Sequence, residues 1–184
     1  DLMGENRVQE YLSKKDLYSK TTENGSAPRI HFIGHLQTNK VKYIINEMDM
    51  IQSVDSVKLA HEIDRLAKAN NKVMDILCEV NIGGEESKSG IAPDKLDELL
   101  EEAAAMENIN IRGLMTIPPP VDSDIFLGRM GELFNKLKTE NRQGVNMDIL
   151  SMGMTHDYAD AVKYGSTLVR IGSGLFGARN YNKI

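Results

Sequence analysis

Short apolar runs rich in Ile, Val and Leu alternate with longer stretches of 3.6-residue periodicity, and this alternation constrains the fold more than any other feature. Strands that lack a clean polar–apolar alternation and are separated by helices are typical of a parallel sheet covered by helices. The sequence therefore predicts an α/β fold, either doubly wound or closed as a barrel. The expected strands are Leu2-Met3, Ile30–Ile33, Met50–Ser53, Asp75–Asn81, Ile111–Thr116, Ile149–Met152 and Thr167–Ile171.

Three of the intervening stretches predict helices, namely Ser56–Asn70, Pro93–Met106 and Thr155–Gly165. The first has a single apolar stripe, with Asp55 or Ser56 available as N-cap. In the second, Pro93 suits the first helical position and acidic residues fill the first turn. The third has Thr155 as its expected N-cap and Gly165 just past its end.

The number of β–α units is one short of the eight that close a TIM barrel, a fold that normally needs about 200 residues or more. No internal repeat or low-complexity linker divides the 184 residues. We therefore expect residues 1–184 to form one domain of the (β/α)8 barrel type, carrying strands two to eight. The first β–α unit is expected to precede Asp1.

Charge and composition make several classes of partner unlikely. Lys and Arg number 22 against 27 Asp and Glu, which gives a net charge of −5, so no basic surface for nucleic acid is expected. No apolar run approaches the roughly 20 residues of a membrane span. Cys78, the single cysteine, lies in an apolar stretch and is expected in the core, as suits a reducing cytosol. We expect a cytoplasmic protein.

Polar residues at the carboxyl ends of the last two predicted strands indicate a phosphate site. In barrels of this kind, ligands collect at those ends, and the last two loops often hold phosphate. Met154 and Thr155 follow one strand, Arg170 lies at the end of the next, and Gly172 and Ser173 follow it. The alternative is that Thr155 is only a helix cap and the glycines only form turns, and spacing alone leaves both interpretations open.

Other clusters carry less information. His31 and His35 are four residues apart, but no carboxylate or thiol stands at ligand spacing, so no metal site is expected. Glu101 and Glu102 are adjacent and point in different directions on a helix, so we interpret them as a solvated face.

Several segments together resemble a known family. They are Gly4–Glu10, His31–Lys40, Val80–Ile91, Arg112–Pro118, Leu150–Asp157, Gly165–Gly172 and Phe176–Arg179. In this order they are similar to the pyridoxal phosphate homeostasis proteins, which are single-domain relatives of the alanine racemase barrel. The resemblance covers the whole chain.

The resemblance implies a carrier of pyridoxal 5′-phosphate (PLP) without robust catalytic turnover. In it, Thr155 takes the place of a phosphate-binding serine in the motif that contains Met154, and Gly172 and Ser173 donate backbone N–H groups. Arg170 would face the pyridine nitrogen, and Asn6 would lie beside the cofactor. The family's Schiff-base lysine lies in a segment that this sequence does not contain, so it is expected upstream of Asp1.

Two other functions compete with the carrier. A PLP-dependent amino-acid racemase shares the barrel, but racemases of this kind carry a second, β-rich domain with a catalytic tyrosine, for which residues 1–184 leave no room. A remnant or interaction module that binds no cofactor is the third possibility. For the carrier, the expected partners are PLP and PLP-dependent apoenzymes, and the expected state is a monomer or weak dimer.

Overall fold

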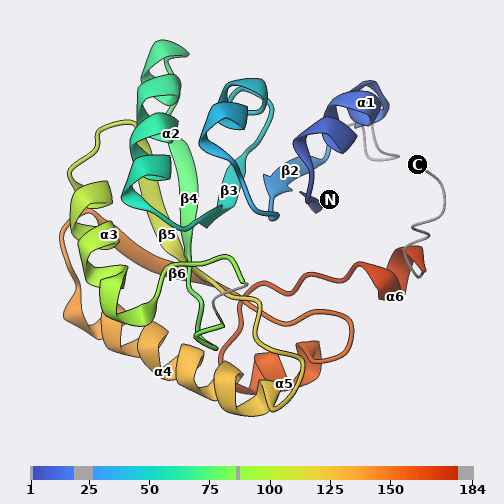
Figure 1. Cartoon of the computed structure of the whole chain (residues 1–184), viewed down its shortest axis with the longest axis vertical. Coiled ribbons are helices and arrows are strands. Elements are labelled where there is room, and N and C mark those ends of the chain that lie inside the picture. Colours follow the sequence, from blue (N-terminus) through green and yellow to red (C-terminus); the bar gives the residue numbers. More distant parts are fainter. Residues whose placement is uncertain (1, 19–26, 86–87, 178–184) are drawn as a thin grey trace.

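The computed structural model describes residues 2–18, 27–85 and 88–177, and its centre is a parallel sheet (Figure 1). The sheet has six strands in the order β1-β2-β3-β4-β5-β6, so each strand pairs with the next strand along the chain. The strands are β1 (Leu2–Glu5), β2 (Arg29–Phe32), β3 (Met50–Val54), β4 (Met74–Glu79), β5 (Ile109–Met115) and β6 (Val145–Ser151). This sequential order is that of a β/α barrel wall, and the predicted α/β class is confirmed.

Helices connect the strands and cover the outer face of the sheet (Figure 1). The α-helices are α1 (Val8–Tyr18), α2 (Val57–Ala69), α3 (Leu96–Ala104), α4 (Ser123–Glu140), α5 (Tyr158–Lys163) and α6 (Ser173–Phe176). Two 3-10 helices, η1 (Thr38–Tyr43) and η2 (Pro93–Lys95), complete the connections. No helix of the described residues has the length and apolar character needed to cross a bilayer.

The sheet curls around a central space. Leu2 at the start of β1 and Leu168 beyond β6 line the same cavity, of about 410 Å³, although they belong to opposite ends of the sheet. Met50, Leu77 and Met115 form a small inner cluster, separate from the main core. The wall therefore has an inner face with few apolar contacts and an outer face that packs on the helices.

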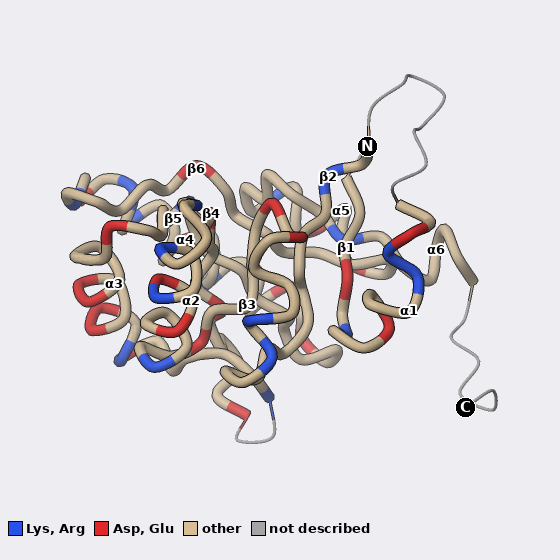
Figure 2. Tube along the Cα trace, turned by 90° about the horizontal axis from the view of Figure 1, so that it is seen from above, with Lys and Arg blue, Asp and Glu red and all other residues tan. Residues whose placement is uncertain are grey.

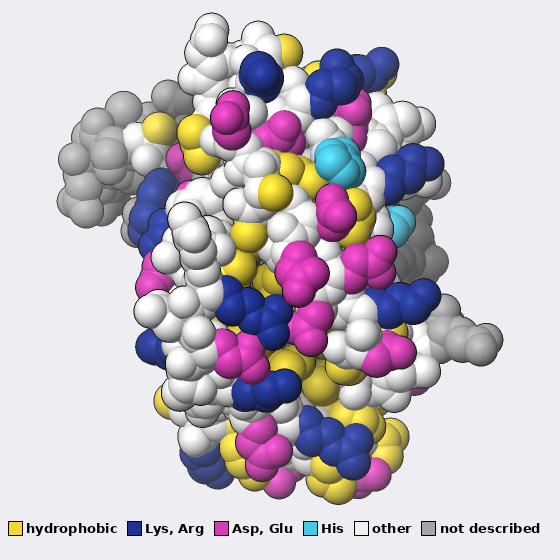
Figure 3. Space-filling view, turned by 90° about the vertical axis from the view of Figure 1, so that its left-hand side faces the viewer, with side chains coloured by type: hydrophobic (Ala, Val, Ile, Leu, Met, Phe, Trp, Pro, Cys, Tyr) yellow, Lys and Arg dark blue, Asp and Glu magenta, His cyan; other side chains and the backbone are white. Residues whose placement is uncertain are grey.

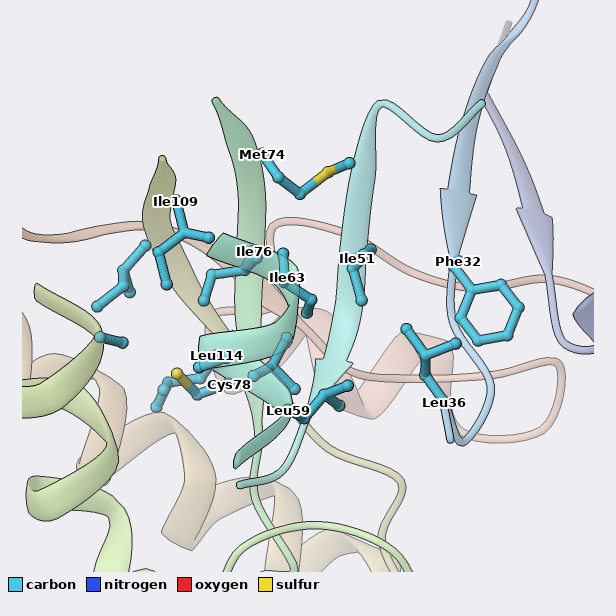
Figure 4. Close-up of a cluster of buried hydrophobic side chains, with 14 of the residues drawn as sticks. Phe32, Leu36, Ile51, Leu59, Ile63, Met74, Ile76, Cys78, Ile109 and Leu114 are labelled. Carbon is cyan, nitrogen blue, oxygen red and sulfur yellow. The ribbon is translucent and has the colours of Figure 1, made fainter. Parts of the chain in front are cut away.

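The outer face carries the main hydrophobic core (Figure 4). Ile51 and Ile76 of adjacent strands pack toward Leu59 and Ile63 of α2, and all four are fully buried. Cys78 lies in the same cluster, fully buried, and burial raises the pKa of its thiol to about 12. The prediction that this cysteine is a core residue is confirmed, because such a thiol stays protonated and unreactive.

Two of the predicted helices are confirmed with small changes. Ser56, rather than Asp55, caps α2, and its hydroxyl accepts a hydrogen bond from the Leu59 N–H. The segment that starts at Pro93 opens as η2 and continues as α3, which buries the expected leucine face. The acidic residues of α3 gather on the outside of the molecule (Figure 2), and Glu101 and Glu102 are exposed as expected.

Two expectations about the elements are wrong, and one helix was missed. Asp157, not Thr155, is the N-cap of α5, because residues 155–157 form a turn before the helix. Thr167–Ile171 is not a strand and makes a single bridge, Ser151 to Leu168. The Thr167 hydroxyl accepts the Leu150 N–H, so a side chain takes a bond that a strand backbone would make. The longest helix, α4, was not predicted.

Charged side chains of both signs are interleaved over the face formed by the left-hand side of Figure 1 (Figure 3). Neighbouring charges there and elsewhere are often paired, as between Arg65 and Glu62 within α2 at 2.7 Å, and between Arg142 and Asp97 at 2.8 Å. This face therefore does not carry the single-sign basic patch that nucleic-acid binding requires.

Candidate functional site

The two predicted phosphate loops meet at the carboxyl end of the sheet. The Ser173 hydroxyl donates to the Thr155 hydroxyl oxygen at 3.2 Å, and the Gly174 N–H donates to the same oxygen at 3.1 Å. Thr155 lies in the turn after β6, and Ser173 and Gly174 begin α6. The structure thus brings together side chains that are 18 residues apart in the chain.

Two further predicted residues lie in the same loops. Met154 is 38% exposed, and its N–H donates to the Asp157 carboxylate at 2.6 Å, so this amide is already bonded within its own turn. Gly172 precedes α6, and a side-chain carbon added there would meet no atom of the described residues within 4 Å. The backbone at Gly172 is therefore open to the approach of a ligand.

Arg170 lies between these loops and the inside of the barrel. Its N–H donates to the Gly153 carbonyl at 2.9 Å, which ties the two loops together. Its guanidinium donates to the Ser151 hydroxyl at 2.6 Å and to the Thr116 carbonyl at 2.8 Å. Burial lowers the pKa of Arg170 to about 10, against the opposing effect of Glu79, so the side chain stays charged at neutral pH.

Asn6 stands apart from the other predicted ligands. It is exposed in the loop after β1, at the same end of the sheet. Its carbonyl oxygen lies so close to Gly34 that a side-chain carbon there would be 2.1 Å away, so Gly34 is needed for this approach. Within the described part of the chain, no hydrogen bond joins Asn6 to the phosphate loops.

Glu79 is a buried acid at this end of the barrel that the sequence did not reveal. It is 3% exposed, one carboxyl oxygen accepts from the Ser89 hydroxyl at 2.7 Å, and the other has no hydrogen-bond partner among the described residues. Burial raises the pKa of this carboxyl, and the charge of Asp55 adds to the effect. His35 and Arg170 lie near enough to oppose the shift.

Buried polar side chains inside the barrel were also missed. His31 and Gln52 are 7% and 1% exposed and are joined by a hydrogen bond of 2.8 Å. Gln52 and Ser53 in the middle of a short strand were only a partial signal: a buried polar side chain needs a partner, but the sequence does not show which of the two points into the barrel. The two histidines weighed together in the sequence separate in the structure, since His35 is exposed and pairs with Asp55 at 3.5 Å. No three metal-binding side chains come together among the described residues.

Fold and site together define a barrel of the alanine racemase N-terminal type. The family model described as "Alanine racemase, N-terminal domain" matches residues 1–180. Among curated relatives, the pyridoxal phosphate homeostasis protein of Aquifex aeolicus is 45% identical over 182 residues, which cover 97% of this chain and 77% of the relative. That of Haemophilus influenzae is 40% identical over 185 residues, with 97% and 76% covered. The chain belongs to the pyridoxal phosphate homeostasis protein family.

Solved structures agree with this assignment. PipY of Synechococcus elongatus, solved with PLP bound, superimposes with a TM-score of 0.83 at 30% identity, over 95% of this chain and 80% of PipY. An alanine racemase of Clostridium difficile superimposes with a TM-score of 0.74 at 16% identity, over 100% of this chain and 46% of the racemase. The second likeness supports the barrel fold alone.

Proposed function

We propose that this protein binds PLP at the carboxyl end of its barrel and thereby carries and buffers the cofactor. The observation that carries the proposal is the convergence of Thr155, Ser173 and the Gly174 N–H next to Arg170. PipY, a structural relative at 30% identity, has been solved with PLP bound, which supports the same ligand here.

The donors present fit a phosphate group. Hydroxyl and backbone N–H groups at a helix start are the usual ligands of phosphate, and a charged acceptor strengthens each hydrogen bond. The hydroxyls of Thr155 and Ser173 bond to each other at 3.2 Å, so a phosphate oxygen can replace one partner with a stronger acceptor. The open backbone at Gly172 leaves space beside them.

We assign separate roles to the other residues. When bound, PLP supplies an aldehyde that reacts with amines and a ring that withdraws electrons. Arg170 would face the ring nitrogen, where a guanidinium donates hydrogen bonds and disfavours a second positive charge, so the ring withdraws electrons less strongly. Asn6 would contact the cofactor from the loop after β1, and Met154 would pack beside the phosphate loop. These residues suit storage of PLP better than catalysis.

Substitution of the phosphate ligands tests the proposal. Thr155→Ala and Ser173→Ala should each weaken PLP binding about tenfold, and the double variant more, because a hydrogen bond to a charged group contributes roughly 1.5–3 kcal/mol. The measurement is a titration that follows PLP absorbance. Thr139→Ala is the matched control, since Thr139 is exposed and bonds only within α4, to the Lys136 carbonyl. A double variant that binds PLP as tightly as the wild type would overturn the site.

We further propose that the loaded protein is a cytoplasmic monomer or weak dimer that hands PLP to PLP-dependent apoenzymes. The proposed phosphate loops lie at one end of the barrel, and Ser173 in them is exposed, so a cofactor bound there is accessible to a recipient. The test is to mix the loaded protein with such an apoenzyme. Direct transfer predicts a rate of activation that rises with carrier concentration at constant free PLP, whereas release into solution predicts no such rise.

A further inference from the structure

Four polar side chains form one continuous hydrogen-bonded chain through the interior of the barrel. The Arg170 guanidinium bonds to the Ser151 hydroxyl at 2.6 Å, and Ser151 bonds to the Gln52 side-chain oxygen at 2.7 Å. The Gln52 side-chain nitrogen bonds to Nδ1 of His31 at 2.8 Å. Ser151, Gln52 and His31 are 0%, 1% and 7% exposed, so water does not substitute for these bonds. This hydrogen-bonded chain of side chains connects the strands β2, β3 and β6.

The donors and acceptors of the four side chains indicate the direction of each hydrogen bond between them. A guanidinium has only donors, so the Ser151 oxygen must accept from Arg170. The Ser151 hydroxyl donates its proton to the Gln52 oxygen, and in this orientation the Gln52 amide presents its N–H2 group to His31. Nδ1 of His31 is therefore an acceptor. A neutral histidine with an unprotonated Nδ1 carries its proton on Nε2.

His31, at the end of the hydrogen-bonded chain opposite to Arg170, lies at the cavity inside the barrel. His31 lines that cavity together with Arg29, Asp49, Asp75 and Arg112. Burial lowers the pKa of His31, and Arg29 acts in the same direction, while Asp49 and Asp75 oppose them. Burial therefore favours the neutral imidazole, in agreement with the bond from Gln52.

We propose that Ser151, oriented by Gln52, is a positioning residue that holds the Arg170 guanidinium at the carboxyl ends of β5 and β6, and that Gln52 fixes His31 as the Nε2–H tautomer. Protonation of Nδ1 would leave two donors facing each other, and a flipped Gln52 amide would take away the oxygen that accepts the Ser151 proton. The interior cavity and the proposed PLP site are thereby linked through one set of bonds. The consequence for PLP rests on the proposed function, whereas the hydrogen-bonded chain does not.

The first test uses the protein without ligand. Nitrogen-15 NMR should show His31 with an unprotonated Nδ1, and resolved Nη–H signals for Arg170, because both are held by buried partners. In Ser151→Ala the signal of the Nη1 group, which bonds to Ser151, should be lost through exchange, whereas that of Nη2, held by the Thr116 carbonyl, should remain. In Gln52→Glu the Arg170 signals should remain, but Nδ1 of His31 should become protonated, because a carboxylate can only accept. A wild-type His31 protonated on Nδ1 would overturn the proposal.

The second test measures PLP affinity. Ser151→Ala should weaken binding about tenfold, because the Arg170 guanidinium keeps only its bond to the Thr116 carbonyl. Ser53→Ala is the matched control, because Ser53 is also a fully buried strand serine, and its hydroxyl has no partner among the described residues. Equal losses in Ser53→Ala and Ser151→Ala would contradict positioning. A wild-type protein that binds no PLP would refute the proposed function, and the ligand-free spectra would still decide the positioning role.

Discussion

Glu79 is a buried carboxylic acid with a raised pKa, so its ionisation makes the stability of the fold depend on pH. Burial is the main cause of the shift, and one carboxyl oxygen has no partner among the described residues. The folded-state pKa lies above the unfolded value, so the neutral acid's contribution to stability is present below the unfolded pKa and is lost as pH rises through the folded pKa. Glu79→Gln removes the buried charge and should raise the free energy of unfolding by about 1 kcal/mol at neutral pH. In acid, where Glu79 is already neutral, the substitution should leave the free energy of unfolding unchanged.

Urea unfolding of the Glu79→Gln variant and the wild type over a range of pH checks this expectation. Glu101→Gln is the control, because Glu101 is exposed on α3 and no buried charge is removed there. The stability difference between wild type and Glu79→Gln must widen as pH rises. A constant difference, or the same widening in Glu101→Gln, would show that burial of Glu79 does not set the pH dependence.

Some site residues could be predicted because they follow a strand end or a short apolar run. Thr155 and Ser173 were found in this way, and the structure joins them. Gln52 and Glu79 could not be found, because the strands that carry them are buried on both faces. Periodicity then does not say which side chains point into the barrel. The Gln52 contact depends on Ser151, 99 residues further along the chain.

At the scale of elements, the packing of α4 depends on one glycine. A side-chain carbon on Gly131 would lie 2.4 Å from the Tyr164 carbonyl oxygen, just beyond α5. Backbone cannot move aside as a flexible side chain can, so Gly131→Ala must push the two helices apart. We expect a loss of roughly 2 kcal/mol or more in the free energy of unfolding, measured by urea denaturation, in the range of overpacked cores.

Gly128→Ala, one turn earlier in α4, is the matched control. Its added carbon would lie 3.4 Å from the edge of the Tyr164 ring, which can turn slightly. Alanine also favours a helix over glycine by about 1 kcal/mol, so this variant should be as stable as the wild type or more stable. Equal destabilisation by both substitutions would mean that the contact with the Tyr164 carbonyl is not the cause.

The same helix shows why some elements escaped prediction. The helices α2 and α3 have strong one-sided apolar patterns, and a serine cap or an N-terminal proline marks where each segment begins. Helix α4 contains Gly128 and Gly131 and follows Asp122, a left-handed residue whose side chain does not cap it. Local signals there argue against a helix, and packing against β6 and α5 overrides them. At Thr167–Ile171 the error was the opposite, because a strand was predicted and none formed. The apolar run does not reveal that a nearby hydroxyl group takes a hydrogen bond of the strand ladder.

At the scale of the whole molecule, the sheet is unevenly paired. The β4–β5 register joins Met74 to Ile109 at one end and Glu79 to Met115 at the other, whereas β2 and β3 share only His31 with Met50 and Phe32 with Ile51. Few shared bonds allow a segment to open without global unfolding. Amides of β4 and β5 should therefore exchange with solvent slowest, through global unfolding, and amides of β1 and β2 should exchange faster, through local opening.

Ligand binding separates these two routes of exchange. A ligand that binds only the folded protein stabilises it by RT ln(1 + [L]/Kd), about 2.7 kcal/mol at 100 times Kd, so global exchange slows about a hundredfold. The proposed phosphate ligands follow β6, and opening of β1 and β2 does not break the bonds of Thr155 to Ser173 and Gly174. Hydrogen exchange with saturating PLP should thus slow β4 and β5 about a hundredfold but β1 and β2 only slightly. Equal slowing throughout would mean that the first two strands must stay closed to hold the cofactor, and that Asn6, just after β1, contributes to its affinity as much as the phosphate loops do.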